Sequence, residues 1–181
     1  MSHEQIWAPW RLEYVTGNSP LPNLDESAEL LPGARRDCFI CCGVPEGDDR
    51  SRLVVDRGER TVTILNRYPY NNGHLLLAPK RHLAGLDELD NETHLEVAAK
   101  LVEWIERLTQ LMQPHGFNVG LNLGRVAGAG LPGHIHWHVV PRWNGDTNFM
   151  PVLAGIRVIP QSLEGLWDLL AGEPGQRPDA L

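Results

Sequence analysis

Three histidines, His134, His136 and His138, alternate with apolar residues in the stretch HIHWHVVPRW. Successive side chains of a β-strand point to opposite faces, so this spacing predicts a strand with three imidazoles in one row and apolar groups behind them. An imidazole titrates near neutral pH and can therefore act as a nucleophile, an acid, a base or a metal ligand. The pattern predicts a strand that carries chemistry.

Two other interpretations of these histidines are open. The first is a half-exposed strand whose imidazoles are solvated, and the second is a metal site made by the three histidines. Residues four apart on a strand are separated by about 13 Å, which is too far for two of them to bind one ion. At most two adjacent histidines of the stretch can therefore share a metal.

The segment RVAGAGLPG runs directly into His134 and contains Gly128, Gly130 and Gly133. Glycines permit positive φ angles and a close approach of backbone N–H groups to a ligand, as a phosphate cradle requires. A hairpin loop that binds nothing is the alternative. Because three histidines follow at once, we predict a phosphate-binding loop.

The three cysteines of the chain, Cys38, Cys41 and Cys42, fall within five residues. An odd and clustered set is a poor disulfide framework, whereas the two-residue spacing of Cys38 and Cys41 is that of half a zinc site. Two nitrogen ligands from elsewhere in the chain would complete such a site.

Five strand patterns and one long helical pattern predict the elements that must position these residues. Apolar and β-branched runs bounded by Gly, Asn and Pro predict strands, and the expected strands span 52–58, 60–66, 73–79, 117–124 and 134–143. The order strands, helix, strands with antiparallel connections predicts an α+β fold, an antiparallel sheet with one long helix across a face. A short amphipathic helix is expected over 162–170.

The long helix is expected over 91–112, with Asp90 or Asn91 as its N-cap and residues 114–116 ending it. Apolar residues recur in it at helical spacing, and the predicted core face comprises Leu95, Ala98, Leu101, Val102, Ile105, Leu108 and Met112.

The length and the net charge of the chain restrict the kinds of partner that it can bind. The chain has 181 residues, a net charge of −7, and 16 Lys and Arg residues that form no basic run. This balance argues against duplex nucleic acid or an acidic membrane as the main partner. The sequence shows no apolar export segment and no membrane span, so we expect a cytoplasmic protein.

One main domain is expected, flanked by two shorter segments. Residues 1–37 are expected to form an N-terminal arm and linker, 38–160 the domain, and 161–181 a C-terminal helix and tail. We expect the aromatic segment Trp7–Val15 to pack on the body of the protein or on a second subunit.

The pattern His, apolar, His, apolar, His, apolar, apolar over His134–Val140 resembles the signature of the histidine-triad family of nucleotide hydrolases and transferases at all seven positions. The resemblance extends over roughly residues 52–142. The segment WAPWRLEYV is similar to the N-terminal stretch of the bacterial branch that contains diadenosine tetraphosphate phosphorylases.

The resemblance implies nucleotidyl transfer through a covalent histidine intermediate. It places the nucleophile at His136, the residue that binds the phosphate and leaving oxygen at His138, and a supporting histidine at His74. It also implies that Asn66 and Asn122 contact the ribose and phosphate of a nucleotide or dinucleotide substrate. The apolar residues Leu53, Val55, Ile64 and Leu65 are the expected slot for the base.

One departure from the family bears on the acceptor. Many family hydrolases carry Gln and then Ser or Thr at positions where this chain has Gly130 and Leu131. This difference favours a phosphorylase, with inorganic phosphate as acceptor in place of water. A hydrolase of dinucleoside polyphosphates or nucleoside phosphoramidates is the alternative enzyme, and a non-catalytic nucleotide-binding signalling protein is the alternative of another class.

The resemblance also implies a structural zinc ion held by Cys38, Cys41, His82 and His134, because zinc-bearing members use the first triad histidine as a ligand. It further implies a homodimer joined through the long helix and an adjoining sheet edge. We expect Val97 and Trp104 to lie off the core face of the helix and to be covered by the second subunit.

Overall fold

The computed structural model describes residues 29–147 and 159–171. The segment Trp7–Val15, expected to pack as an arm, lies outside the described residues, as does most of the C-terminal tail. The division of the chain into arm, domain and tail therefore stays a prediction. No helix of the described residues is both long and apolar enough to cross a membrane.

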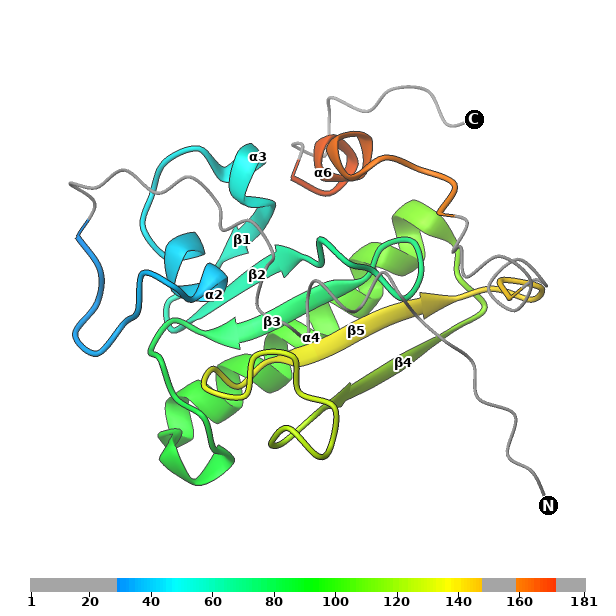
Figure 1. The fold of residues 1–181 in the computed structure, drawn as a ribbon. Coiled ribbons are helices and arrows are strands. Elements are labelled where there is room, and N and C mark those ends of the chain that lie inside the picture. The colour runs from blue at the N-terminus through cyan, green and yellow to red at the C-terminus, as the bar shows by residue number, and fades with distance from the viewer. Residues whose placement is uncertain (1–28, 148–158, 172–181) are drawn as a thin grey trace, which may run out of the picture.

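Five strands form one antiparallel sheet in the order β1-β2-β3-β5-β4 (Figure 1). Their bounds are β1 Val54–Arg57, β2 Thr61–Leu65, β3 Leu75–Pro79, β4 Gly116–Leu121 and β5 Trp137–Arg142. All five residues of β2 and of β3 are buried, as expected for inner strands covered on both faces. The predicted α+β fold, with an antiparallel sheet and one long helix, is confirmed.

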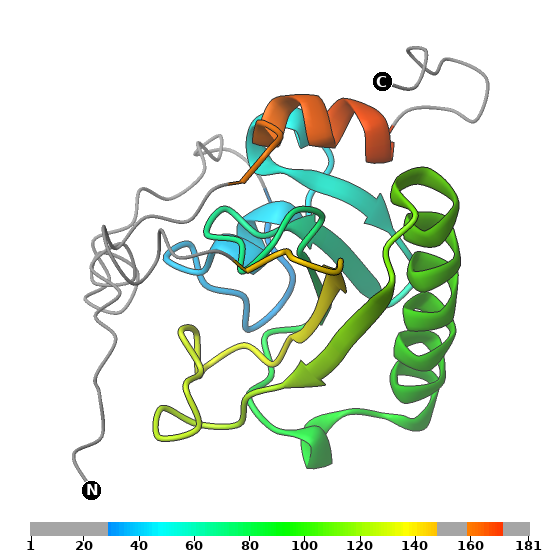
Figure 2. The same ribbon diagram turned by 90° about the vertical axis from the view of Figure 1, so that its right-hand side faces the viewer.

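Helices cover both faces of the sheet. The long helix α4, Asn91–Met112, lies along one face, and the short helix α2, Phe39–Gly43, lies on the other (Figure 2). The carboxylate of Asp90 accepts a hydrogen bond from the Thr93 N–H and caps the start of α4. The predicted bounds of this helix are therefore confirmed.

Within the described residues, the remaining helices are α3, Asp49–Arg52, a 3₁₀ turn, Leu86–Glu88, and α6, Leu163–Ala171. The C-terminal helix α6 packs on β1, where the indole N–H of Trp167 donates to the carbonyl oxygen of Val54 at 2.7 Å. The expected short C-terminal helix is thus present at the edge of the sheet.

The predicted core face of α4 is wrong in part. Val97 and Trp104, expected to face a second subunit, are 3% and 1% exposed in the core of this chain, whereas Leu95 and Val102 are 71% and 58% exposed. The apolar residues of α4 form two neighbouring stripes, and helical periodicity alone does not choose between them. Contact with the sheet determines which stripe is buried, because the buried indole N–H of Trp104 donates a hydrogen bond to Thr63 Oγ1 at 3.1 Å.

The predicted strand over the histidine stretch is also shorter than expected. Strand β5 begins at Trp137, so that His138 lies in the strand while His134 and His136 precede it. The preceding segment bonds instead to the loop after β3, where Ile135 N–H donates to Leu83 O at 2.7 Å. His134 contacts Cys38, Cys41 and His82, whereas the rings of His136 and His138 lie next to each other with centroids 5.0 Å apart.

Candidate active site and metal centre

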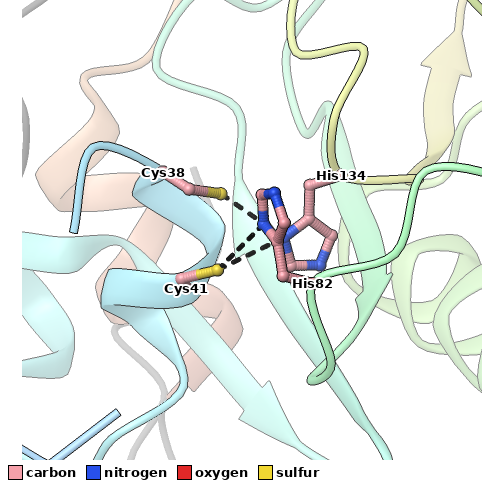
Figure 3. Close-up of side chains that lie close together, drawn as sticks. All are labelled: Cys38, Cys41, His82 and His134. Atoms are coloured by element: carbon pink, nitrogen blue, oxygen red, sulfur yellow. Dashed lines mark hydrogen bonds between the residues drawn. The ribbon is translucent and has the colours of Figure 1, made fainter. Parts of the chain in front are cut away.

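Four buried or half-buried side chains from three parts of the chain meet beside the sheet (Figure 3). Cys38 and Cys41 come from the start of α2, His82 from the loop after β3, and His134 from the segment before β5. One ligand atom from each residue lies within 4.8 Å of the others. These are the four residues that the sequence suggested as zinc ligands.

Three separations within the cluster are close to those around a tetrahedral ion. His134 Nδ1 lies 3.3 Å from Cys38 Sγ and 3.5 Å from Cys41 Sγ, and His82 Nδ1 lies 3.2 Å from Cys41 Sγ. Ligand atoms around tetrahedral zinc lie roughly 3.3–3.8 Å apart, given Zn–S and Zn–N distances of about 2.3 and 2.05 Å. Two thiolates and two imidazoles are also a donor set that structural zinc prefers.

The tautomer of His134 suits a metal ligand. Its Nε2 lies 2.8 Å from the carbonyl oxygen of Pro79, which can only accept, so Nε2 carries the proton. Nδ1 is then left with its lone pair directed at the two sulfurs. A hydrogen bond from a ligand histidine to a backbone carbonyl is how proteins orient such ligands.

The surroundings of the two cysteines shift their pKa values in opposite directions. The hydrogen bond from the Cys38 thiol lowers the pKa of Cys41. The same hydrogen bond, together with burial, raises the pKa of Cys38. The pair therefore favours the thiolate at Cys41, and the thiolate is the form of cysteine that binds a metal ion.

His136 presents a nitrogen that is suited to nucleophilic attack. The side chain is 3% exposed, and its Nδ1–H donates to the carbonyl oxygen of His134 at 2.8 Å. The lone pair consequently sits on Nε2, which has no hydrogen-bond partner among the described residues. Burial lowers the pKa of His136, so the ring stays neutral and nucleophilic.

A second pair of imidazoles lies next to His136. The backbone N–H of Tyr70 donates to His74 Nδ1 at 3.0 Å, so His74 carries its proton on Nε2. That Nε2 lies 2.9 Å from His138 Nδ1 and donates to it, which leaves the proton of a neutral His138 on its own Nε2. The rings of His136 and His138 are 5.0 Å apart between centroids. The ring that carries the bare nitrogen therefore lies next to the ring that carries the protonated one.

Asn66 contacts His74 in the described structure. Its Oδ1 accepts from the Tyr68 N–H at 2.9 Å, and its Nδ2 lies 3.2 Å from His74 Nδ1. The predicted contact of Asn66 with ribose is untested and stays a prediction. The expected base slot also stays a prediction. In the structure, Leu53, Ile64 and Leu65 are buried in the core cluster, and Val55 packs against it.

The glycine-rich loop connects β4 to the histidine segment, as predicted. The N–H of Gly128, at φ +91°, donates to Arg125 O at 3.0 Å, and a Cβ on this residue would lie 4.0 Å from Asn122 Nδ2. A Cβ on Gly133 would lie 3.5 Å from His82 Nε2, so this glycine packs beside the metal cluster. Phosphate binding by Gly128, Gly130, Gly133 and Asn122 stays a prediction.

Sequence reasoning missed Tyr70, which contacts both His74 and His138. The only sequence signal was an aromatic residue in the polar connection RYPYNNG, four residues before His74.

Comparisons with known proteins agree on one family. The family model described as HIT domain matches residues 49–145. AP-4-A phosphorylase of Mycobacterium tuberculosis is 38% identical over 175 residues, which cover 97% of this chain and 86% of that protein.

Two solved structures share the fold. A zinc-bound histidine-triad family protein from Mycobacterium smegmatis is 31% identical, with a TM-score of 0.54, covering 66% of this chain and 81% of that one. A hypothetical histidine-triad nucleotide-binding protein from Sulfolobus tokodaii is 26% identical, with a TM-score of 0.55, covering 74% and 89%.

Proposed function

Because this chain belongs to the histidine-triad family, we propose that it is an enzyme that transfers a nucleotidyl group from a dinucleoside polyphosphate to inorganic phosphate through a covalent adduct on His136. One observation carries the proposal. The bare Nε2 of His136 is held beside an imidazole, His138, whose Nε2 carries a proton. A nucleophile and a donor for the leaving group are thereby placed next to each other.

In the first step, the lone pair of His136 Nε2 attacks the α-phosphorus and forms a P–N bond. The P–O bond to the remaining polyphosphate breaks, its electron pair stays on the departing oxygen, and the Nε2–H of His138 donates to that oxygen. The carbonyl oxygen of His134 accepts from His136 Nδ1–H and stabilises the positive charge that develops on the ring.

In the second step, an oxygen of inorganic phosphate attacks the same phosphorus. The P–N bond breaks, its electron pair returns to His136 Nε2, the proton of the attacking phosphate hydroxyl passes to His138 Nε2 and restores the donor, and a nucleoside diphosphate leaves. Two features support phosphate as the acceptor. Gly130 and Leu131 stand where family hydrolases carry Gln and Ser or Thr, and the relative that is 38% identical is named AP-4-A phosphorylase.

The products formed from diadenosine tetraphosphate test this proposal. With phosphate present we expect ADP and ATP in equal amounts, and isotopically labelled phosphate should appear in the ADP. Hydrolysis would instead give AMP and ATP, or two ADP without label. If added phosphate changes neither the rate nor the products, the chain is a hydrolase, and if the dinucleotide binds but is not cleaved, it is a nucleotide-binding protein without catalysis.

For the metal centre, we propose that Cys38, Cys41, His82 and His134 hold a structural zinc ion. When bound, zinc supplies a fixed link between α2 and the segment that leads into β5. The chain's own residues carry that link to the nucleophile, because the carbonyl of the ligand His134 orients the ring of His136.

We also propose a homodimer, on other residues than those the sequence suggested. Leu95 and Val102 are exposed apolar residues of α4, and Val119, 44% exposed, lies on the edge strand β4. A second copy would cover this apolar surface and the strand edge.

At micromolar concentration, we expect light scattering to give twice the monomer mass of 20.2 kDa. The double variant Leu95→Glu, Val102→Glu should give the monomer mass, because charge in a dimer interface is costly to bury. Gln110→Glu, an exposed position of the same helix, is the charge control and should stay dimeric. A monomeric unmodified protein would rule out the dimer.

A further inference from the structure

The loop between β2 and β3, residues 67–73, is held in place at several points. Asn71 Nδ2 donates to Pro141 O at 3.1 Å and to Asp146 Oδ2 at 2.8 Å, which ties the loop to the end of β5. Asn72, 9% exposed, donates through Nδ2 to Gln161 Oε1 at 3.3 Å. The conformation of this loop is therefore set by its anchors.

Tyr70 directly precedes these anchors and contacts the imidazole pair in two ways. Its backbone N–H donates to His74 Nδ1 at 3.0 Å. Its ring packs against both imidazoles, with centroid distances of 4.8 Å to His74 and 5.8 Å to His138 and interplanar angles of 32° and 33°. One residue thus contacts both rings that are joined by the 2.9 Å hydrogen bond.

The backbone and ring contacts of Tyr70 affect different properties of the imidazole pair His74 and His138. The backbone N–H fixes the tautomer of His74, because a nitrogen that accepts a hydrogen bond cannot carry the proton of a neutral ring. The tyrosine ring restricts rotation of the two imidazoles, since aromatic rings at these distances pack in preferred tilted arrangements. The side chain of Tyr70 therefore acts on orientation, and its backbone acts on protonation.

We propose that Tyr70 is a positioning residue, whose ring acts through His74 to hold His138 where its Nε2–H reaches the leaving oxygen. The proposal rests on the function proposed above, because it assigns His138 the role of donor to the leaving group. It adds a residue that does not itself touch the reacting atoms. Donation depends steeply on distance and direction, so loosening His138 should reduce turnover more than substrate binding.

A spectroscopic test needs no substrate. His74 is 1% exposed, so its hydrogen-bonded Nε2–H proton should give a sharp and downfield signal in ¹⁵N-labelled protein. We expect Tyr70→Leu to broaden this signal through exchange with water, while Tyr70→Phe, which keeps the ring, leaves it sharp. Tyr68→Leu removes an aromatic ring from the same loop and should also leave the signal sharp.

A kinetic test compares two aryl esters of AMP. Phenolate needs a proton on departure far more than 4-nitrophenolate does, so the phenyl ester depends more on a positioned donor. Tyr70→Leu should lower kcat about tenfold for the phenyl ester and less than about twofold for the 4-nitrophenyl ester, with KM nearly unchanged. Tyr70→Phe should restore kcat for both. A purely structural role would lower both esters equally.

The outcomes separate this inference from the proposed function. An unchanged His74 signal and an unchanged ester ratio in Tyr70→Leu would overturn the role of Tyr70, whatever the enzyme cleaves. A broadened signal in a protein that cleaves no nucleotide would support the positioning contact and overturn the proposed function instead. If Tyr70→Leu does not fold, Tyr70→Met replaces it, and the same two measurements decide.

Discussion

His136→Asn should lower the turnover of diadenosine tetraphosphate by roughly 10³-fold or more, because it removes the nitrogen that we propose forms the covalent adduct. Asparagine offers no nucleophilic nitrogen, yet its amide N–H can still donate to the His134 carbonyl that now holds the imidazole. We therefore expect the affinity for nucleotide to change little. Turnover is measured by product separation, and binding by calorimetry with a non-cleavable nucleotide.

The adduct itself can be observed. Quenching the unmodified enzyme during turnover without phosphate should give a protein mass increased by one nucleotidyl group, which is labile to acid as a phosphoramidate is. His136→Asn should show no such species. His94→Asn, which removes an imidazole from the surface of α4, is the matched control and should keep both the adduct and the rate. Wild-type turnover by His136→Asn would exclude a covalent route through this residue.

Cys41→Ser should remove the zinc ion and destabilise the domain. Cys41 Sγ lies within 3.5 Å of ring nitrogens of both His82 and His134, and serine is a poor zinc ligand. Because metal binding contributes directly to the free energy of folding, we expect a loss of at least about 3 kcal/mol. For a domain of this size that corresponds to roughly 6–12 °C in Tm.

Cys42→Ser is the matched control, since Cys42 is equally buried but its thiol donates to the Arg36 carbonyl. It should retain one zinc per chain by atomic absorption, whereas Cys41→Ser retains none. Unmodified protein treated with a strong chelator should melt like Cys41→Ser and should also turn over more slowly, because His134 orients His136. Protein purified without chelator and found free of stoichiometric metal would disprove the zinc site.

The sequence alone predicted the fold class because its signals are periodic and local. The strand patterns over 60–66 and 73–79 and the bounds of α4 at Asn91 and Met112 follow from alternation, helical spacing and the cap at Asp90. The spacing of the histidines indicated a strand that carries chemistry, whereas their roles as nucleophile and metal ligand came from the family resemblance and stay predictions. A resemblance carried by seven positions was enough to indicate the family, which the comparisons confirm.

Only the tertiary structure decided which atoms face one another. Helical spacing favoured the stripe with Leu95 and Val102 as the core face of α4, whereas the sheet, with Thr63 as partner for the Trp104 indole, buries the neighbouring stripe. Regular alternation suggested one strand over all three histidines, yet β5 begins at Trp137, after His134 and His136. Hydrogen bonds to carbonyl and amide groups far along the chain then set each tautomer, and Tyr70 became visible as a contact of His74 and His138 only in three dimensions. Such pairings depend on register and loop conformation, which arise from the packing of the whole chain and leave no periodic signal in the sequence.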